Sequence, residues 1–134
     1  MDLALKGKNV VITGGSKGIG QRIALAFAEE GANVAICARG VEALRATEKE
    51  LHAKNVKVYA ASCDIADPEA LDAFLQGVKD SLGSVDVLVH NASALATGPG
   101  LEDWKSSLEV DLMAAVHACN KVIPWMAEAG GGSI

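Results

Sequence analysis

Aromatic residues, cysteine and proline are all scarce in this sequence. Phe, Trp and Tyr together make up 4% of the 134 residues, and there are three cysteines and three prolines. Cys37, Cys63 and Cys119 are odd in number and widely spaced, so they indicate neither a disulfide framework nor a metal site built on paired cysteines. We therefore expect buried, reduced thiols and no bound metal.

Runs of basic residues and long apolar stretches are absent as well. The net charge is -5, and no cluster of Lys or Arg offers the basic face that binding to a nucleic acid backbone needs. No apolar stretch reaches the roughly 18 residues of a membrane span, and the N-terminus lacks the layout of a secretory signal. The sequence thus predicts a cytoplasmic protein with no nucleic acid or membrane partner.

Four short apolar runs alternate with helix-like segments. The runs are rich in Val and Ile and cover Asn9–Thr13, Asn33–Ala38, Val56–Ala61 and Val85–His90. Near-continuous apolar strands between amphipathic helices are typical of a parallel sheet that is covered on both faces. The sequence therefore predicts an α/β fold, a doubly wound parallel sheet with helices on both faces, in one domain over residues 1–134.

The first two helices are marked by glycine at their ends and by apolar residues at helical spacing. The first is expected from Gly18 to Gly31, with an inner face made of Ile19, Ile23, Phe27 and Ala28. The second is expected from Val41 to Lys54 and is more polar. Its inward residues are predicted to be Leu44 and Leu51.

The last two helices carry clearer stripes. The third is predicted to begin at Asp67 as its N-cap, with Pro68 in the first helical position, and to end at Gly83. Its stripe is Leu71, Phe74, Leu75, Val78 and Leu82. The fourth is expected from Leu101 to Met126, with a stripe of Trp104, Leu108, Ala115, Cys119, Val122 and Met126.

A glycine-rich turn, Thr13–Gly20, follows the first apolar run directly. Gly14, Gly18 and Gly20 fall where a buried strand passes into a helix, and such a turn lets backbone amides approach a phosphate at the positive end of that helix. Ser16 and Lys17 add a hydroxyl and a cation. The spacing is not the common G-x-G-x-x-G, but the strand before it and the helix after it favour nucleotide binding.

The end of the second apolar run indicates the choice of coenzyme. Sites that prefer NAD place an acid there to hold the ribose hydroxyls, whereas an arginine suits the 2′-phosphate of NADP. This chain has Ala38 followed by Arg39, and Lys17 adds a second positive charge. Together they favour NADP(H) over NAD(H); the alternative is a solvated arginine at the start of a helix.

Polar residues follow the third and fourth runs. Asp64 after the third run has two interpretations. It could accept a hydrogen bond from the adenine amino group while Ile65 packs on the ring, or it could cap the next turn.

After the fourth run, Asn91 is expected to tie its loop to the sheet. His90 suggests acid–base or metal chemistry, but with no second ligand at metal spacing an ordinary strand-end histidine is favoured. Asp111 lies on an apolar stripe, so it either faces a cleft with a partner or is exposed by rotation of the helix.

With these residues assembled, the chain resembles the short-chain dehydrogenase/reductase family, most closely its reductases of the 3-oxoacyl-carrier-protein type. The matching motifs occur in the family's order and span the whole chain: Thr13–Gly20, Cys63-Asp64-Ile65, Asn91-Ala92, Val110-Asp111-Leu112 and Gly132-Ser133-Ile134. The resemblance implies a Rossmann-type fold that binds NADP(H) and transfers hydride between that coenzyme and a small carbonyl or alcohol substrate.

The resemblance also assigns roles to residues. It implies that the dinucleotide is lined by Gly14, Ser16, Lys17, Ile19, Arg39, Asp64 and Asn91, and the same motifs add Gly18, Gly20, Ile65 and Ala92. Three positions depart from the family's pattern. The family's Asn-Asn-Ala-Gly is His90-Asn91-Ala92-Ser93 here, and its helix Asn, a member of the proton relay, is Asp111, which is thus the candidate catalytic position.

The family's catalytic Ser and Tyr-x-x-x-Lys follow the Gly-Ser-Ile strand, and neither occurs here, because the only tyrosine is Tyr59. We therefore expect the N-terminal half of a longer oxidoreductase, ending before its fifth strand is complete and inactive as written. An uncovered sheet edge and helix face would favour a homo-oligomer. The alternative is a non-catalytic nucleotide-binding or regulatory module that ends near Ile134.

Overall fold

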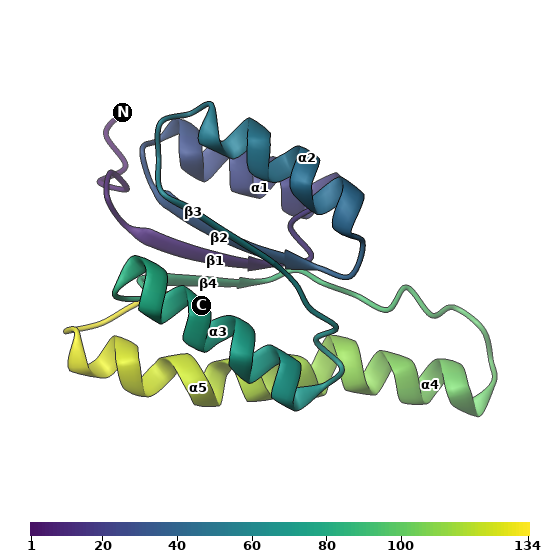
Figure 1. Ribbon diagram of the computed structural model, residues 1–134. Coiled ribbons are helices and arrows are strands. Elements are labelled where there is room, and N and C mark those ends of the chain that lie inside the picture. Colours follow the sequence, from purple (N-terminus) through teal and green to yellow (C-terminus); the bar gives the residue numbers. More distant parts are fainter.

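Four parallel strands form one sheet in the order β3-β2-β1-β4 in the computed structural model, which describes residues 1–134. The predicted doubly wound α/β class is confirmed (Figure 1). The strands are β1 Asn9–Thr13, β2 Asn33–Ala38, β3 Val58–Ser62 and β4 Val87–His90. β1 and β2 match their predicted bounds. β4 begins after Val85 because its pairing with β1 starts at Val10 and Val87.

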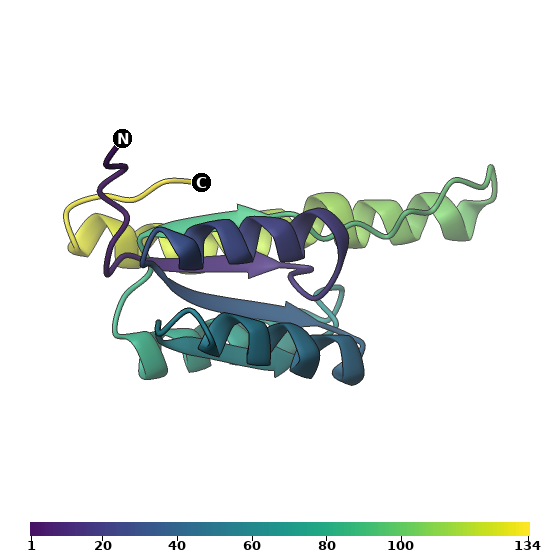
Figure 2. The ribbon, with the colours of Figure 1, turned by 90° about the horizontal axis from the view of Figure 1, so that it is seen from above.

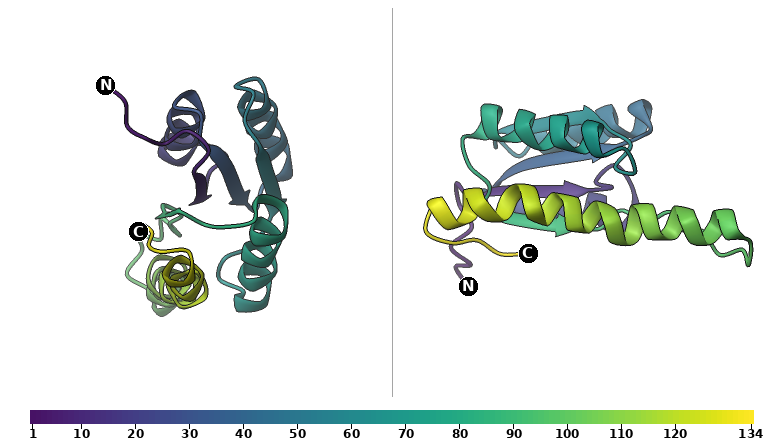
Figure 3. Two further views of the ribbon diagram at one scale, coloured as in Figure 1. Left: turned by 90° about the vertical axis from the view of Figure 1, so that its left-hand side faces the viewer. Right: turned by 90° about the horizontal axis from the view of Figure 1, so that it is seen from below.

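Helices cover both faces of the sheet. Figure 1 shows α1, Gly18–Glu29, and α2, Val41–His52, on one face, and α3, Pro68–Leu82, and α5, Ala114–Glu128, on the other. The end-on view in Figure 3 shows the same layers. Alternate residues of β1 supply the two cores: Val10 and Ile12 face α1 and α2, and Val11 faces α3 and α5. Leu44 and Leu51 are buried as predicted.

The inner face of α1 differs from the prediction. The helix packs through its small residues, Gly20, Ala24 and Ala28, whereas Ile19 is 74% exposed. The reason is the close approach of α1 to the end of β1, since a Cβ on Gly20 would overlap the carbonyl oxygen of Gly14. Large side chains do not fit on that side of the first turn, so Ile19 points away from the core. Ala28 is the one buried member of the predicted stripe.

α3 follows the prediction at both ends. The Asp67 side chain accepts a hydrogen bond from the backbone amide of Glu69 at 3.0 Å, and Pro68 occupies the first helical position. Gly83 ends the helix with φ at +90°, a conformation that favours glycine. The predicted stripe packs into the core, with Leu82 half-buried and the others buried: Leu71, Phe74, Leu75 and Val78.

The predicted fourth helix is interrupted by a π-helical turn. Its parts are α4 Leu101–Ser107, η1 Leu108–Met113 and α5, and at the end of η1 the amide of Ala114 donates to the carbonyl of Glu109. α5 buries Val122 and Met126 as predicted. The wider turn changes which earlier residues face the core, so Ala114 and Ala118 are buried in place of the predicted Ala115 and Cys119. No helix of the structure is both long enough and apolar enough to cross a membrane.

α4 extends past the carboxyl ends of the strands. Figure 2 shows it beyond the sheet, continuous with α5 and away from α1 and α2. It therefore has no core to pack against, and the predicted inward residues Trp104 and Leu108 are 64% and 51% exposed. This part of the predicted stripe is wrong for that reason.

An isolated bridge joins the segment after α5 to the edge of the sheet. Ser133 forms a parallel bridge with Val87, in which its amide donates to the carbonyl of Asp86 at 2.9 Å and its carbonyl accepts from the amide of Leu88 at 3.0 Å. The chain thus returns to the free edge of β4 at the position where the Gly-Ser-Ile motif is expected to enter the sheet.

Candidate functional site

The glycine-rich turn lies at the carboxyl ends of the strands, between β1 and α1. The amides of Gly14 and Gly15 both donate to the carbonyl of Cys37, at 3.0 and 3.2 Å, so they hold the turn to β2. The free amides come later, at Gly18, Ile19 and Gly20, where α1 begins without a side-chain cap. An anion would therefore be bound at the start of α1, where the exposed Ile19 also lies.

Asn91 joins the turn to the end of β4. Its side-chain amide donates to the carbonyls of Thr13 and Gly14, both at 3.1 Å. Gly14 has a φ of +67°, and a Cβ there would crowd Ala92 and Asn91. The predicted tie between the Asn91 loop and the sheet is confirmed. It places Asn91 and Ala92 directly beside the first glycine of the turn.

His90 bridges β1 and η1. The Thr13 hydroxyl accepts from the amides of Asn91 and Ala92, so its own hydrogen is directed to His90 Nδ1, 3.3 Å away. This network assigns the ring hydrogen to Nε2, which donates to the carbonyl of Val110 at 3.2 Å. Both ring nitrogens are thus engaged, which favours the structural interpretation of His90.

Asp111 lies on η1 and contacts the loop that follows β4. Its Oδ2 accepts from the Ser93 hydroxyl at 3.0 Å, and its Oδ1 accepts from the amide of Ala94 at 2.8 Å. The Ser93 oxygen in turn accepts from the amide of Leu95, which has a φ of +52°. The sequence offered two interpretations of Asp111, one with a hydrogen-bond partner and one with an exposed side chain. Each holds in part, because the residue is exposed and also accepts hydrogen bonds from Ser93 and Ala94.

A hollow of about 500 Å³ separates the turn from the start of α2. It is lined by Lys17, Gly40, Val41, Glu42, Ala43 and Ala46, and α2 begins there without a side-chain cap. Arg39 is exposed next to Gly40, but its side chain is not part of the hollow's wall. Neither Lys17 nor Arg39 forms an ion pair, so both cations are free to meet an anionic ligand.

Ser16 is held by a residue that the sequence interpretation missed. Ser16 is 8% exposed, and its carbonyl accepts a hydrogen bond from the Thr47 hydroxyl at 2.9 Å. Thr47 lies on α2 between Leu44 and Leu51, in the same inward stripe. A polar residue at a buried stripe position is the signal that could have identified it.

Asp64 and Ile65 follow β3. One oxygen of Asp64 accepts from the amide of Ala66 at 3.0 Å, so the structure contains the predicted turn cap. Ile65 is 7% exposed and packs in the apolar cluster beneath the sheet, which leaves little of its surface for an adenine ring. Between the two interpretations of this motif, the observed contacts favour the turn cap.

Two thiols lie close together under this edge of the sheet. Cys37 and Cys63 are both buried, as predicted, and Cys119 on α5 is half-buried. Hydrogen bonding to Cys63, with burial as a further cause, raises the pKa of the Cys37 thiol well above its usual value. The same hydrogen bond lowers the pKa of Cys63. No group of His, Cys, Asp or Glu side chains is arranged to hold a metal ion.

The tyrosine of β3 lies away from this edge. The Tyr59 ring stacks on Phe74 of α3, with 5.9 Å between ring centroids, and its hydroxyl reaches Gly77, where a Cβ would overlap it. Tyr59 therefore contributes to packing between the sheet and α3.

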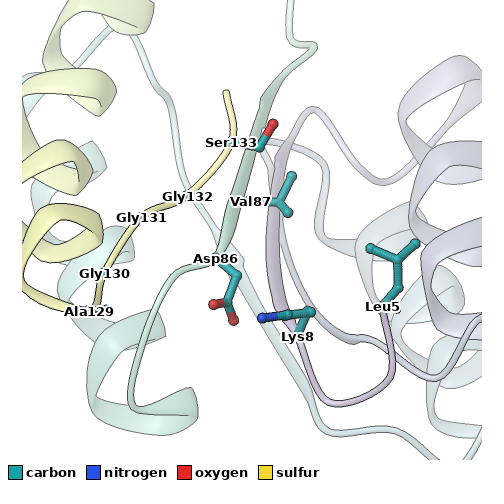
Figure 4. A pocket seen from close by; sticks show the side chains of 9 residues that line it. All are labelled: Leu5, Lys8, Asp86, Val87, Ala129, Gly130, Gly131, Gly132 and Ser133. Carbon is teal, nitrogen blue, oxygen red and sulfur yellow. The ribbon is translucent and has the colours of Figure 1, made fainter. Parts of the chain in front are cut away.

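A second hollow, of about 290 Å³, lies at the opposite edge, next to the amino ends of β1 and β4. Figure 4 shows the side chains of Lys8 and Asp86 pointing toward each other in it, beside the glycine run that follows α5. The Asp86 carboxylate also accepts from the amide of Asn9 at 2.8 Å. This hollow holds none of the residues of the candidate coenzyme site.

Comparisons with known proteins agree with the fold and the motifs. The family model for short chain dehydrogenases matches residues 8–134. The 3-oxoacyl-[acyl-carrier-protein] reductase of Staphylococcus aureus is 34% identical over 132 residues, which are 95% of this chain and 54% of that protein. The chain thus spans about half the length of this relative.

Two solved structures are similar over the same length. An L-sorbose reductase from Gluconobacter frateurii, complexed with NADPH and L-sorbose, has a TM-score of 0.90 and 38% identity, covering 98% of this chain and 52% of that one. An NAD+-bound xylitol dehydrogenase has a TM-score of 0.89 and 27% identity, covering 96% and 51%. Both structures hold a nicotinamide coenzyme, NADPH in the sorbose reductase and NAD+ in the xylitol dehydrogenase.

Proposed function

The chain belongs to the short-chain dehydrogenase family, and from that premise we propose that it is the coenzyme-binding half of an NADP(H)-dependent oxidoreductase. The observation that carries the proposal is the uncapped start of α1 at Gly18–Gly20, directly preceded by Lys17, a cation without an ion pair. Arg39, also without an ion pair, follows the neighbouring strand β2. Free amides at a helix start bind phosphate, and the cations add charge beside them. When bound, the coenzyme supplies the hydride that is exchanged with the substrate carbon.

The preference for NADP(H) is supported by the hollow between Lys17 and α2. The amides at the start of α2 have no side-chain cap there, and Lys17 faces them, which suits a 2′-phosphate. Glu42 is the only acidic residue that lines this hollow, so it is the one charge there that would repel a phosphate. The similar sorbose reductase is complexed with NADPH, whereas the similar xylitol dehydrogenase is bound to NAD+. Titration with both coenzymes is therefore needed to test the preference.

The proposed coenzyme site follows the carboxyl edge of the sheet. The pyrophosphate is assigned to the turn and the start of α1, the adenosine ribose to the hollow beside Arg39, and the nicotinamide to the end of β4. The assigned residues are Gly14, Ser16, Lys17, Gly18, Ile19, Gly20, Arg39, Asn91 and Ala92. The hydrogen bonds that Asn91 and Ala92 make with Thr13 and Gly14 support the assignment of these two residues, because they hold both beside the turn.

Asp111 is proposed as a positioning residue for the nicotinamide side of the site. Its two hydrogen bonds hold Ser93 and Ala94 against η1, and these residues directly follow Asn91 and Ala92. The proton donor for a carbonyl substrate is assigned to residues beyond Ile134, because Tyr59 is engaged at α3. We therefore propose that residues 1–134 bind coenzyme but do not turn over substrate.

The same proposal includes a partner, a substrate class and a location. The substrate is a small carbonyl or alcohol compound. A second copy of the chain is the proposed partner for four exposed apolar residues of α4 and η1, here called the α4 stripe: Leu101, Trp104, Leu108 and Leu112. Three free cysteines fit a reducing compartment such as the cytoplasm.

A coenzyme titration of the 134-residue chain tests the proposal. NADPH fluorescence and calorimetry are expected to show saturable binding at one site, tighter than for NADH, with no oxidation of NADPH when ketones or aldehydes are added. The coding sequence after Ile134 provides the second test, and a Tyr-x-x-x-Lys motif is expected in it. A stop codon at that position would overturn the oxidoreductase and favour the non-catalytic module.

A further inference from the structure

We propose that Thr47 is a positioning residue that sets the separation between Lys17 and α2, and thereby the affinity for the 2′-phosphate of NADP(H). The inference rests on the proposed function. Thr47 is 1% exposed, so it cannot touch a ligand itself. Its effect must pass through the residue it binds, which is Ser16.

The hydrogen bond from Thr47 joins the two walls of the hollow. Its hydroxyl donates to the carbonyl of Ser16 at 2.9 Å, and the next residue in the chain is Lys17, one wall of the hollow. Thr47 itself follows Ala46, which lies in the other wall. The bond therefore connects the turn with α2 through residues that directly adjoin the two walls of the hollow.

The other side-chain links between this region and α2 are weaker anchors. Gln21 donates to Glu50 at 3.3 Å and Lys54 pairs with Glu29 at 3.0 Å, but both contacts are exposed and attach to α1. Exposed pairs contribute little to stability. The Thr47 bond is buried and attaches to the turn itself, so it restricts the main chain directly before Lys17.

Losing this bond is expected to affect the two coenzymes unequally. The amides of Gly18–Gly20 that would meet the pyrophosphate belong to α1, which keeps its packing on the sheet through Ala24 and Ala28. Lys17 precedes the helix and keeps only the hydrogen bond from the Gln21 amide to its carbonyl, at 3.2 Å, while the turn directly before it loses its link to α2. Binding of the 2′-phosphate, which only NADP(H) carries, should therefore weaken more than binding of the rest of the dinucleotide.

The test compares Thr47→Val with Thr47→Ser by calorimetric titration with NADPH and with NADH. Valine keeps the shape of the side chain and removes the donor, whereas serine keeps the donor. Thr47→Val is expected to weaken NADPH about tenfold and NADH less than about threefold. Thr47→Ser should stay within about twofold of the wild type for both coenzymes. Thr47→Ala, which removes the same donor, replaces the valine variant if that variant does not fold.

The possible outcomes separate the inference from the function on which it rests. Equal weakening of NADPH and NADH, or no change in either, would overturn the positioning role while leaving the coenzyme site in place. Failure of the wild type to bind either coenzyme would overturn the proposed function and the inference together. A serine variant that loses selectivity like the valine variant would also contradict the role of the hydroxyl.

Discussion

The carboxylate of Asp111 accepts a hydrogen bond from the hydroxyl of Ser93, with 3.0 Å between Oδ2 and Oγ. These residues are two of the positions at which the chain departs from the family pattern described above. Ser93 and Asp111 are thus in direct contact, and the serine hydroxyl donates a hydrogen bond that the carboxylate accepts. Asp111 also accepts from the amide of Ala94 at 2.8 Å, so both of its oxygens are engaged with the loop after β4.

Removing the Asp111 carboxylate should loosen that loop. Asp111→Ala is expected to speed hydrogen exchange at the amide of Ala94 by about tenfold and to lower the free energy of unfolding by about 1 kcal/mol, as for lost hydrogen bonds at an exposed site. Asp111→Asn keeps an acceptor for Ala94 and a partner for Ser93, so it should change less. Glu109→Ala is the control, because Glu109 is an exposed acid of the same turn whose side chain forms no hydrogen bond. Unchanged exchange in Asp111→Ala would contradict the assignment.

Gly20 should tolerate no side chain, because a Cβ there would overlap the carbonyl oxygen of Gly14 and the side-chain amide of Asn91. Gly20→Ala is expected to lower the free energy of unfolding by about 2 kcal/mol or more, as for overpacking in a core. Gly40→Ala is the matched control, since its Cβ would enter open space and its φ is negative. Chemical denaturation of both variants provides the measurement, and equal stabilities would refute the close approach of α1 to β1.

The parts of the fold that the sequence predicted well are those set by local patterns. β1 and β2 are continuous apolar runs, and α3 has a cap, a proline and a terminal glycine that act within one or two turns. On the inner face of α1 the prediction was wrong at Ile19, which is more apolar than Gly20, whereas Ala28 is buried and Ile23 and Phe27 pack against the core. The close packing of Gly20 against Gly14 and Asn91 depends on residues that meet only in the fold.

The same distinction applies to the site. The glycine turn, Arg39 and Asn91 are recognisable in the chain because each stands at the end of a strand. The π-turn η1 could not be predicted, since it accompanies contacts that His90 and Ser93 make with it from about 20 residues away in the sequence. Thr47 was predictable in principle, because it is a polar residue between Leu44 and Leu51, but its partner Ser16 is known only from the structure.

Arg39 should favour the phosphorylated coenzyme. The side chain is exposed at the end of β2 and forms no ion pair, so its charge is available to a 2′-phosphate. Arg39→Asp is expected to weaken NADPH by about tenfold or more, by loss of a charge-assisted hydrogen bond and addition of a like charge, and to shift preference towards NADH. Lys57→Asp, at an exposed lysine before β3, makes the same change of charge away from the site. An unchanged preference in Arg39→Asp would refute the assignment.

The three thiols should react at very different rates. Cys37 is buried, and the hydrogen bond with Cys63 raises its pKa, so at neutral pH it carries less thiolate than an ordinary cysteine. Iodoacetamide is expected to modify the half-buried Cys119 first and Cys37 last, as followed by peptide mass spectrometry. In urea all three should react together, and Cys119→Ser should remove the fast phase. Rapid labelling of Cys37 in the native protein would show that the end of β2 opens.

The α4 stripe should mediate self-association. Leu101, Trp104, Leu108 and Leu112 recur every three to four residues along α4 and η1 and are 86%, 64%, 51% and 53% exposed. Light scattering of the wild type is expected to show a dimer or larger species. Leu108→Glu should shift it towards monomer, because a charge buried between two copies is costly. Leu3→Glu makes the same substitution at an exposed leucine near the N-terminus and should leave the mass unchanged. A monomeric wild type at micromolar concentration, or equal effects of the two variants, would remove the α4 stripe as the contact between copies.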